Sequence, residues 1–178
     1  MPDRYIVKSL DPRRIDLAFP VVQSSYPKLG LERWRDFARA MMAGGVDTAG
    51  MAMAGAAGGT DPKVVTMPHA QPTGIVVAQI GQGYIHGLFT YQVANNLCHG
   101  RVLQVDVFVA LSLFDPTAAA EALLAEVERV AKQHRCDAIH LSLPSLPDGD
   151  LKERIQATGL HPEGVRLCKS MILATAAE

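Results

Sequence analysis

Two adjacent residues, Cys98 and His99, form the clearest pair of reactive side chains in this sequence. A thiol beside an imidazole is typical of nucleophilic cysteine catalysis, in which the imidazole takes the thiol proton. Side chains of sequence neighbours seldom point at one another, so we favour a non-catalytic interpretation of this pair. His140 lies in an apolar stretch that predicts a central strand. A hydrogen-bonded core histidine is more common there than a catalytic one.

The three cysteines, Cys98, Cys136 and Cys168, are widely spaced, with no Cys-x-x-Cys and no His pair at zinc spacing. This spacing favours neither a disulfide framework nor a structural metal site, so we expect no metal. Free thiols fit a reducing compartment, and we expect a cytoplasmic protein. The N-terminus lacks an apolar signal core and no stretch approaches about 18 uninterrupted apolar residues, so we expect no membrane partner.

The overall composition is that of an ordinary packed protein. The chain has 178 residues, of which 48% are hydrophobic and 20% charged, and its formal net charge is -1. This length predicts a single domain spanning residues 1–178. A net charge so close to zero provides no global field to attract a polyanion, so we expect no nucleic-acid partner.

The N-terminal part of the chain predicts one strand, two helices and a long loop. Residues 5–10 are extended-friendly, 14–25 predict a short apolar helix interrupted by Pro20, and 31–42 predict an amphipathic helix. Residues 43–73 are rich in Gly, Ala and Met without periodicity, which predicts a loop, either mobile or covering another part of the molecule.

Two apolar segments and a strand with period two follow. Residues 74–80 and 84–93 flank Gly81-Gln82-Gly83, which predicts an antiparallel hairpin. Residues 95–100 form a polar connection. After it, apolar and other residues alternate along 102–111, as in a strand.

The remaining segments predict a parallel strand pair joined by a helix. Asp115-Pro116 suits a helix start, with Asp at the N-cap and Pro at the first position, and the apolar stripe continues to about His134. Residues 138–143 then form a strand parallel to 102–111. Residues 150–158 predict a helix and 165–173 a last strand. The fold class is α/β (α+β), a mixed and mostly antiparallel sheet with one parallel pair, flanked by helices.

Three local stretches, together with this order of elements, resemble the GNAT superfamily of acyl-CoA-dependent N-acyltransferases. They are the hairpin Gly74 to Val93, the strand and helix of residues 102–134 with the Leu123-Leu124 doublet, and Ala157-Thr158-Gly159-Leu160 followed by Cys168-Lys169-Ser170-Met171. Together they cover roughly the last 105 residues. The resemblance implies a GNAT-like fold whose sheet splays between the two parallel strands.

The resemblance also implies acetyl-CoA or another acyl-CoA as co-substrate, bound in that gap at the first strand and the helix N-terminus. The cofactor-binding residues that it implies are Phe108, Val109, Ala110, Ser112, Thr117, Ala118 and Ala120. Asp115 stands where the family has a phosphate-binding Arg or Gln, and Pro116 lacks an N–H donor. Ile155 stands where many members carry a Tyr that protonates the leaving thiolate.

For catalysis, the resemblance implies an acidic base on the strand before the pyrophosphate loop, and Asp106 fits that position, with Gln104 and His86 as positioners. The simpler interpretation of Asp106 is a solvent-facing strand residue, and that of His86 a structural or surface histidine. For Trp34 and a Met-rich segment we have two interpretations: either they line a pocket for the acceptor, or they form part of the core and of a dimer surface.

The function that follows is transfer of an acyl group from acyl-CoA to the amine of an unidentified small molecule or peptide. A homodimer is common among proteins of this kind. Two alternatives stay open. One is a catalytically inactive GNAT-fold protein that binds a ligand or partner, which Asp115, Pro116 and Ile155 favour. The other is an unrelated α/β binding domain, because a fold does not determine a function.

Overall fold

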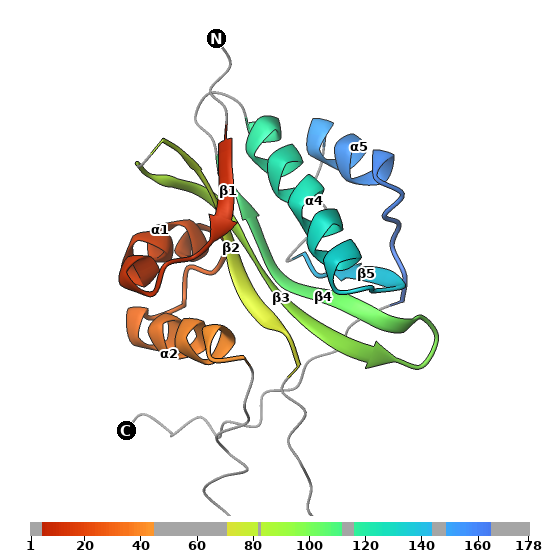
Figure 1. Ribbon diagram of the computed structural model, residues 1–178. Helices are drawn as coiled ribbons and strands as arrows, with labels where there is room; N and C mark the ends of the chain where they lie inside the picture. Colours follow the sequence, from red (N-terminus) through yellow and green to blue (C-terminus); the bar gives the residue numbers. More distant parts are fainter. Residues whose placement is uncertain (1–4, 45–70, 82, 112–115, 144–148, 165–178) are drawn as a thin grey trace, which may run out of the picture.

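A computed structural model describes residues 5–44, 71–81, 83–111, 116–143 and 149–164 (Figure 1). The elements run in the order β1 (Tyr5–Ser9), η1 (Pro12–Arg14), α1 (Ile15–Ser25), α2 (Leu31–Met42), β2 (Thr73–Ile80), β3 (Ile85–Asn96), β4 (Gly100–Ala110), α4 (Pro116–Gln133), β5 (Ala138–Leu141) and α5 (Asp150–Ala157). The bounds of α2, β2 and α4 agree closely with those that hydrophobic periodicity predicts.

The strands form one sheet in the order β1-β2-β3-β4-β5. The pairs β1–β2, β2–β3 and β3–β4 are antiparallel, and β4–β5 is parallel. The 18-residue helix α4 makes the crossover between the two parallel strands. The predicted fold class, a mixed and mostly antiparallel sheet with one parallel pair, is confirmed.

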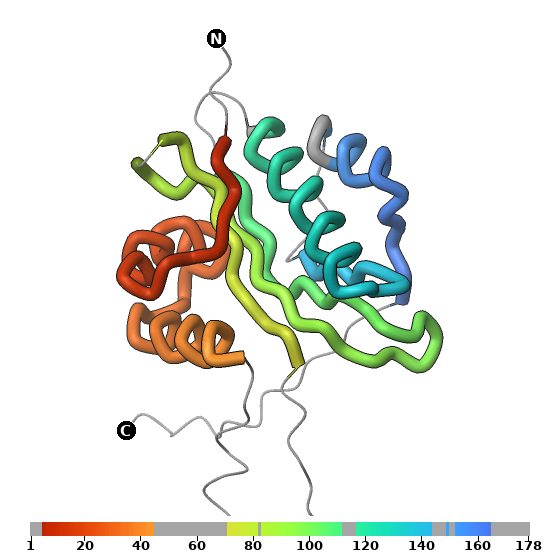
Figure 2. Tube along the Cα trace, viewed as in Figure 1, coloured from red at the N-terminus to blue at the C-terminus, as the bar shows by residue number. Residues whose placement is uncertain are grey.

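Helices cover both faces of this sheet. Figure 2 shows α1 and α2 on one side of the strands and α4 with α5 on the other. Alternation along the strands supplies an apolar core to each side. Leu103 and Leu123 are fully buried on the α4 side, and Leu88 and Trp34 on the α1/α2 side. The indole N–H of Trp34 donates a buried hydrogen bond to the Ile15 carbonyl at 2.8 Å.

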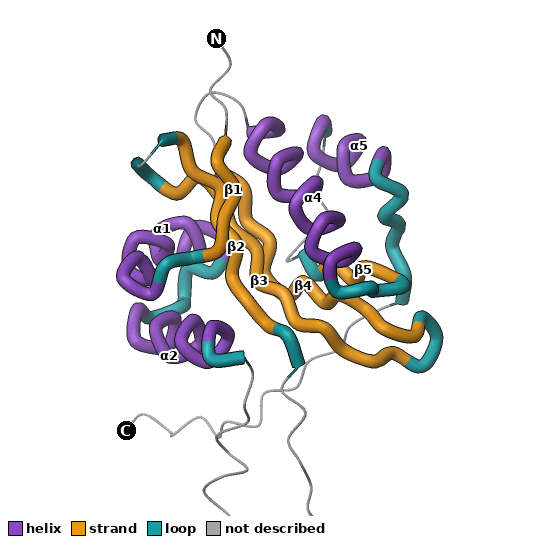
Figure 3. The backbone as a smooth tube through the Cα atoms, in the orientation of Figure 1, coloured by secondary structure: helices purple, strands orange, loops and turns teal. Residues whose placement is uncertain are grey.

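Two local predictions differ from the structure. Helix α1 runs through Pro20 without interruption. Its apolar side, which includes Ala18 and Val22, is buried against the sheet, and this burial outweighs the loss of one backbone hydrogen bond. The polar stretch 95–100 is a tight hairpin: β3 continues to Asn96, and β4 begins at Gly100. Figure 3 shows the short turn between them.

Several predicted segments fall wholly or partly outside the described residues. They are most of the loop 43–73, the helix start at Asp115, and the last strand at 165–173. The prediction of a single domain stays a prediction. Among the helices that the structure describes, none has the length and apolar character needed to cross a membrane.

Candidate active site

Asp106 occupies a β-bulge in β4. On one side of the bulge Tyr91 pairs with Val105, and on the other Thr90 pairs with Val107, so Asp106 is the extra residue between two regular stretches of the ladder. A bulge bends its strand and redirects side chains, and bulges are frequent beside active sites. The candidate base is therefore located where β4 changes direction.

The side chain of Asp106 lies on the sheet face that carries α1 and α2. Leu103 and Val105 belong to the core on the α4 side, and the Gln104 amide, on the opposite face, donates to Asp106 Oδ1 at 3.1 Å. Asp106 and Gln104 are both half-buried. Gln104, which the sequence suggests as a positioner, is thus hydrogen-bonded to Asp106, and its positioning role stays a prediction.

An apolar cavity of about 160 Å³ opens on the same face, next to the bulge. Val107 lines it from β4, and Trp34 and Phe37 line it from α2. Trp34 is a core residue, whereas Phe37 is 38% exposed. Trp34 is therefore a core residue that also lines this cavity, and the use of the cavity by an acceptor stays a prediction.

The pairing of β5 with β4 ends just before the bulge. The parallel pairing runs from Val102 to Val105 and ends in a hydrogen bond from Ser142 N–H to the Val105 carbonyl at 2.8 Å. Farther along, Leu111 N–H donates to His86 on β3 at 2.6 Å. Backbone groups alternate along a strand, so the N–H and C=O of Phe108 and Ala110 are directed to the side on which β5 pairs earlier in the strand.

Helix α4 begins close to this side of β4. Only five residues separate the end of β4 at Ala110 from Pro116, the first residue of α4. In the first turn Thr117 and Ala118 are half-buried, and Ala120 is fully buried. The positive end of the helix dipole is thereby placed at the carboxyl end of β4, where an anion is stabilised. Ser112 lies outside the described residues.

His86 is placed away from Asp106. It lies on β3 next to Gly87, which pairs with Ala110, so its position is across from Leu111. That point is five strand positions from Asp106, a distance of roughly 17 Å. The His86 ring is half-buried and packs edge-on against Tyr5, with ring centroids 5.7 Å apart. The structure therefore does not bring the two side chains together.

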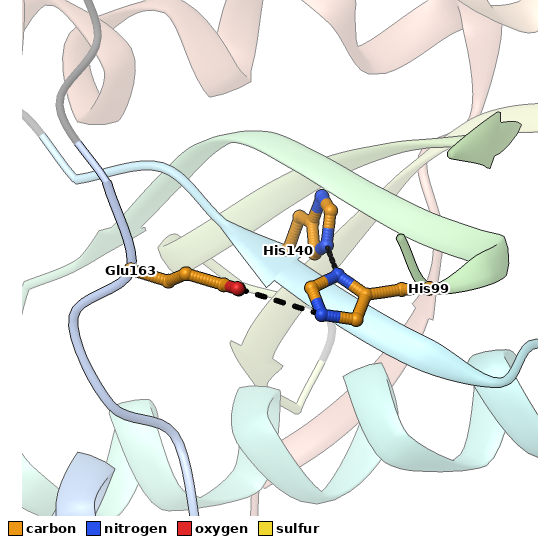
Figure 4. Close-up of side chains that lie close together, drawn as sticks. All are labelled: His99, His140 and Glu163. Atoms are coloured by element: carbon orange, nitrogen blue, oxygen red, sulfur yellow. Dashed lines mark hydrogen bonds and ion pairs between the residues drawn. The ribbon is translucent and has the colours of Figure 1, made fainter. Parts of the chain in front are cut away.

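His99, His140 and Glu163 form a cluster that the sequence did not predict (Figure 4). His99 Nδ1 lies 3.0 Å from His140 Nε2, and His99 Nε2 lies 3.5 Å from a Glu163 oxygen. His140 is hydrogen-bonded, as predicted for a core histidine. However, its strand β5 ends the described sheet rather than lying inside it, and the side chain is half-buried.

The Cys98–His99 pair is not arranged for thiol activation. Both of their backbone N–H groups donate to Asn96 Oδ1, at 2.8 and 3.0 Å, which closes the β3–β4 turn. The nitrogens of the His99 ring face His140 and Glu163. Cys98 is exposed, and burial raises the pKa of the other described thiol, Cys136, which disfavours its nucleophilic form.

Ile155 is a core residue of α5. Its side chain is 8% exposed and belongs to the cluster that includes Leu123 and Leu124 of α4. An ion pair between Arg154 and Glu121 also joins the two helices. The position that the resemblance assigns to a proton donor is thus held by an apolar side chain that packs α5 against α4.

Comparisons by sequence find nothing: no protein-family model and no curated protein matches this chain. Comparisons by structure find acetyltransferases. Glucosamine-6-phosphate N-acetyltransferase from Arabidopsis thaliana superposes with a TM-score of 0.62 at 11% identity, over 95% of this chain and 99% of its own. The aminoglycoside N-acetyltransferase AAC(6')-Iy, solved in complex with CoA, gives 0.65 at 12%, over 97% and 98%.

A third neighbour is ribosomal-protein-alanine N-acetyltransferase from Brucella melitensis, with a TM-score of 0.62 at 12% identity, over 93% of this chain and 99% of its own. Each comparison covers nearly the whole of both chains. The chain therefore has the GNAT fold. Its structural neighbours are N-acetyltransferases, and identities this low show the fold alone.

Proposed function

We propose that this protein is an acyl-CoA-dependent N-acyltransferase. The observation that supports the proposal most directly is that the pairing of β5 with β4 ends at the Asp106 bulge, whereas β4 continues to Ala110. Beyond that point backbone groups of Phe108 and Ala110 are directed to the side on which β5 pairs earlier in the strand, close to the N-terminus of α4, and Phe108 lies two residues from the Asp106 carboxylate. Ligands of open α/β sheets bind at such carboxyl ends.

In this proposal the backbone of Phe108 and Ala110 binds the pantetheine arm of acyl-CoA. The first turn of α4, at Thr117 and Ala118, binds the pyrophosphate through the helix dipole and backbone N–H groups. Backbone N–H groups of β4 also polarise the acyl carbonyl, because they stabilise negative charge on its oxygen as the amine attacks.

Asp106 acts as the base, with Gln104 holding its carboxylate. The amine nitrogen attacks the thioester carbon, and Asp106 takes the amine proton. The C–S bond then breaks and CoA leaves as the thiolate. The acceptor approaches from the α1/α2 face, where the cavity lined by Val107 and Phe37 fits a small apolar group next to the amine. A role for His86 in positioning stays a prediction.

The binding half of the proposal is tested by a charge placed at the α4 N-terminus. Ala118→Glu adds a carboxylate roughly 5 Å from the bound pyrophosphate, which costs about 3 kcal/mol at an effective dielectric near 20, or about a hundredfold in affinity. The same charge stabilises the helix itself, because it lies at the positive end of the dipole. Isothermal titration with acetyl-CoA measures the first effect and thermal unfolding the second.

The matched control is Ala125→Glu, an exposed position on the same helix about 10 Å farther along. It adds the same charge at about one Debye length from the pyrophosphate, so acetyl-CoA affinity is expected to change little. The proposal is contradicted if wild-type protein gives no saturable binding at millimolar acetyl-CoA, or if both variants weaken binding equally.

The second candidate function is a GNAT-fold binding protein without catalysis, and the buried Ile155 favours it. In the acetyltransferase reaction the leaving thiolate accepts a proton, and the side chain at position 155 provides none. Binding of acetyl-CoA without release of free CoA thiol in the presence of a panel of amines supports this alternative. Turnover with any amine in the panel excludes it.

A further inference from the structure

We propose that His99, His140 and Glu163 bind a divalent transition-metal ion of the Zn²⁺ class. Each side chain offers one ligand atom, and the three atoms lie within 4.8 Å of one another. Figure 4 shows His99 between the other two side chains, with His140 at its Nδ1 and Glu163 at its Nε2. The three residues come from separate segments: the β3–β4 turn, β5 and the stretch after α5. This site is independent of acyl transfer.

The contact between the imidazoles supports the proposal most directly. His99 Nδ1 and His140 Nε2 face each other at 3.0 Å. Only one proton fits between two such lone pairs, and a metal ion takes the place of that proton. Two nitrogens on tetrahedral Zn²⁺ at about 2.0–2.1 Å are roughly 3.4 Å apart, so the nitrogens separate by a few tenths of an ångström and each ring turns by roughly 35° until its lone pair points at the ion.

Glu163 supplies the oxygen ligand. Its carboxylate lies 3.5 Å from His99 Nε2, which is the opposite ring nitrogen from the one that faces His140. Its side chain is 60% exposed, so it turns toward an ion held at Nδ1 without disturbing the core. Two imidazoles, one carboxylate and a water form a common zinc coordination set. Imidazole nitrogen selects Zn²⁺, Ni²⁺, Co²⁺ or Cu²⁺, whereas Mg²⁺ and Ca²⁺ require mostly oxygen ligands.

The backbone holds two of the ligands in place. Asn96 Oδ1 accepts the backbone N–H of His99 at 3.0 Å, which closes the turn that carries this ring. His140 is held by the parallel pairing of β5 with β4, opposite Gln104. A pair of ligands fixed in this way loses less entropy on binding an ion than two mobile side chains do.

Solvent reaches the cluster through two cavities. Cavities of about 470 and 630 Å³ both include His99, His140 and Glu163 in their walls. The His99 side chain is 34% exposed. The ion therefore has a path of entry, and there is room for the water that completes its coordination.

Isothermal titration of ZnCl₂ into tag-free, chelator-treated full-length protein tests the proposal, with MgCl₂ as the comparison ion. The expected result is saturable binding of about one Zn²⁺ per chain and no binding of Mg²⁺. His140→Ala and His99→Ala are expected to weaken Zn²⁺ binding more than about a hundredfold. Glu163→Gln is expected to weaken it about tenfold to a hundredfold.

The matched control is His161→Ala. His161 lines the same two cavities, but its ring faces the Gly159 carbonyl at 3.3 Å and lies outside the cluster. Its removal should leave Zn²⁺ affinity unchanged. Visible absorption of the Co²⁺-loaded protein should show the tetrahedral bands, and these should be lost in His140→Ala but kept in His161→Ala.

Thermal unfolding separates ligand loss from misfolding. An ion that binds only the folded chain raises the Tm of wild type and His161→Ala. Glu163→Gln changes an exposed side chain and keeps the fold, so it remains informative even if a histidine variant does not fold. The proposal is overturned if wild type does not bind Zn²⁺ at about millimolar concentration. It is also overturned if Glu163→Gln and the histidine variants that fold all bind like wild type.

Discussion

The two ends of the β4–β5 pair are built in opposite ways. At the carboxyl end the pairing with β5 stops, a bulge displaces Asp106, and backbone groups of β4 beyond the bulge are directed to the side on which β5 was paired. At the amino end a tight turn, fixed by Asn96, brings His99 against His140. A ligand at the carboxyl end therefore meets backbone groups and a helix dipole, whereas a ligand at the amino end meets the side chains of His99, His140 and Glu163.

This difference determines which ligands each end suits. Backbone N–H groups and a helix N-terminus stabilise extended anionic ligands, with little discrimination among side groups. Imidazole and carboxylate groups bind a compact cation through directed lone pairs. Under the two proposals, the same strand pair binds an anion at one end and a cation at the other, about one strand length apart.

The largest expected effect is on the rate of acyl transfer, which only the carboxyl end of the strand pair is proposed to catalyse. Asp106→Asn keeps the hydrogen bond to Gln104 but removes the base, so kcat for acyl transfer should fall about 10²- to 10⁴-fold. Affinities for acetyl-CoA and Zn²⁺ should both stay at wild-type values. Steady-state release of CoA thiol and two titrations measure these quantities. An unchanged kcat shows that Asp106 is not the base.

A smaller effect on ligand binding is expected from a side chain added near the carboxyl end of β4, at Gly87. A Cβ added to Gly87 would lie 2.7 Å from the Val109 carbonyl oxygen and 2.8 Å from Leu123 Cδ1. Gly87→Ala therefore forces β3 away from β4 and should destabilise the protein by about 1–3 kcal/mol. Because Val109 and Ala110 move with it, acetyl-CoA binding should weaken, whereas Zn²⁺ binding should not. Urea unfolding and both titrations test this.

The reciprocal change is Gly100→Ala at the amino end. Gly100 has a φ of 68°, and an added Cβ would lie 2.7 Å from Asp137 Oδ2, which accepts the Arg101 N–H. A left-handed alanine costs roughly 1–2 kcal/mol. The strain falls next to His99, so Zn²⁺ binding should weaken and acetyl-CoA binding should not. If both glycine variants weaken both ligands equally, the two ends do not behave as separate sites.

Sequence patterns predict the carboxyl end of the β4–β5 pair well, because each of its elements has a pattern that can be recognised within a short stretch of the chain. Alternation along residues 102–111 and an amphipathic stretch ending near His134 are enough to predict a parallel pair with a helical crossover. They also place Asp106 on β4. The bulge is invisible in the sequence, because polar and apolar residues alternate without a break through Gln104-Val105-Asp106-Val107 while the pairing with β3 shifts by one.

The cluster at the amino end is not predictable from the spacing of its residues in the sequence. His99 and His140 are 41 residues apart, and Glu163 comes from a third segment. Familiar zinc patterns require closely spaced ligands on one turn or helix, so a search for them passes over this cluster. The separation of His86 from Asp106 has the same origin, because the register of β3 against β4 depends on long-range pairing.

The smallest expected effect lies away from both ends, where Arg35 on α2 holds Asp16 on α1 in a two-point ion pair with distances of 2.8 and 2.6 Å. This hydrogen bonding with Arg35 lowers the pKa of Asp16. A carboxyl with a lowered pKa stabilises the fold above its unfolded pKa of about 3.9, and the contribution is lost as pH falls through the folded value.

Asp16→Asn should therefore reduce the free energy of unfolding slightly near pH 7, and the difference from wild type should vanish in acid. Asp36→Asn is the control, because Asp36 makes only a single 3.3 Å contact with Arg39. Urea unfolding from about pH 3 to 7 measures both. Neither variant should change acetyl-CoA or Zn²⁺ binding, since both helices lie beside the sheet and not at an end of the strand pair. A ligand effect at Asp16 places the acceptor side of the cleft closer to α1 than the bulge implies.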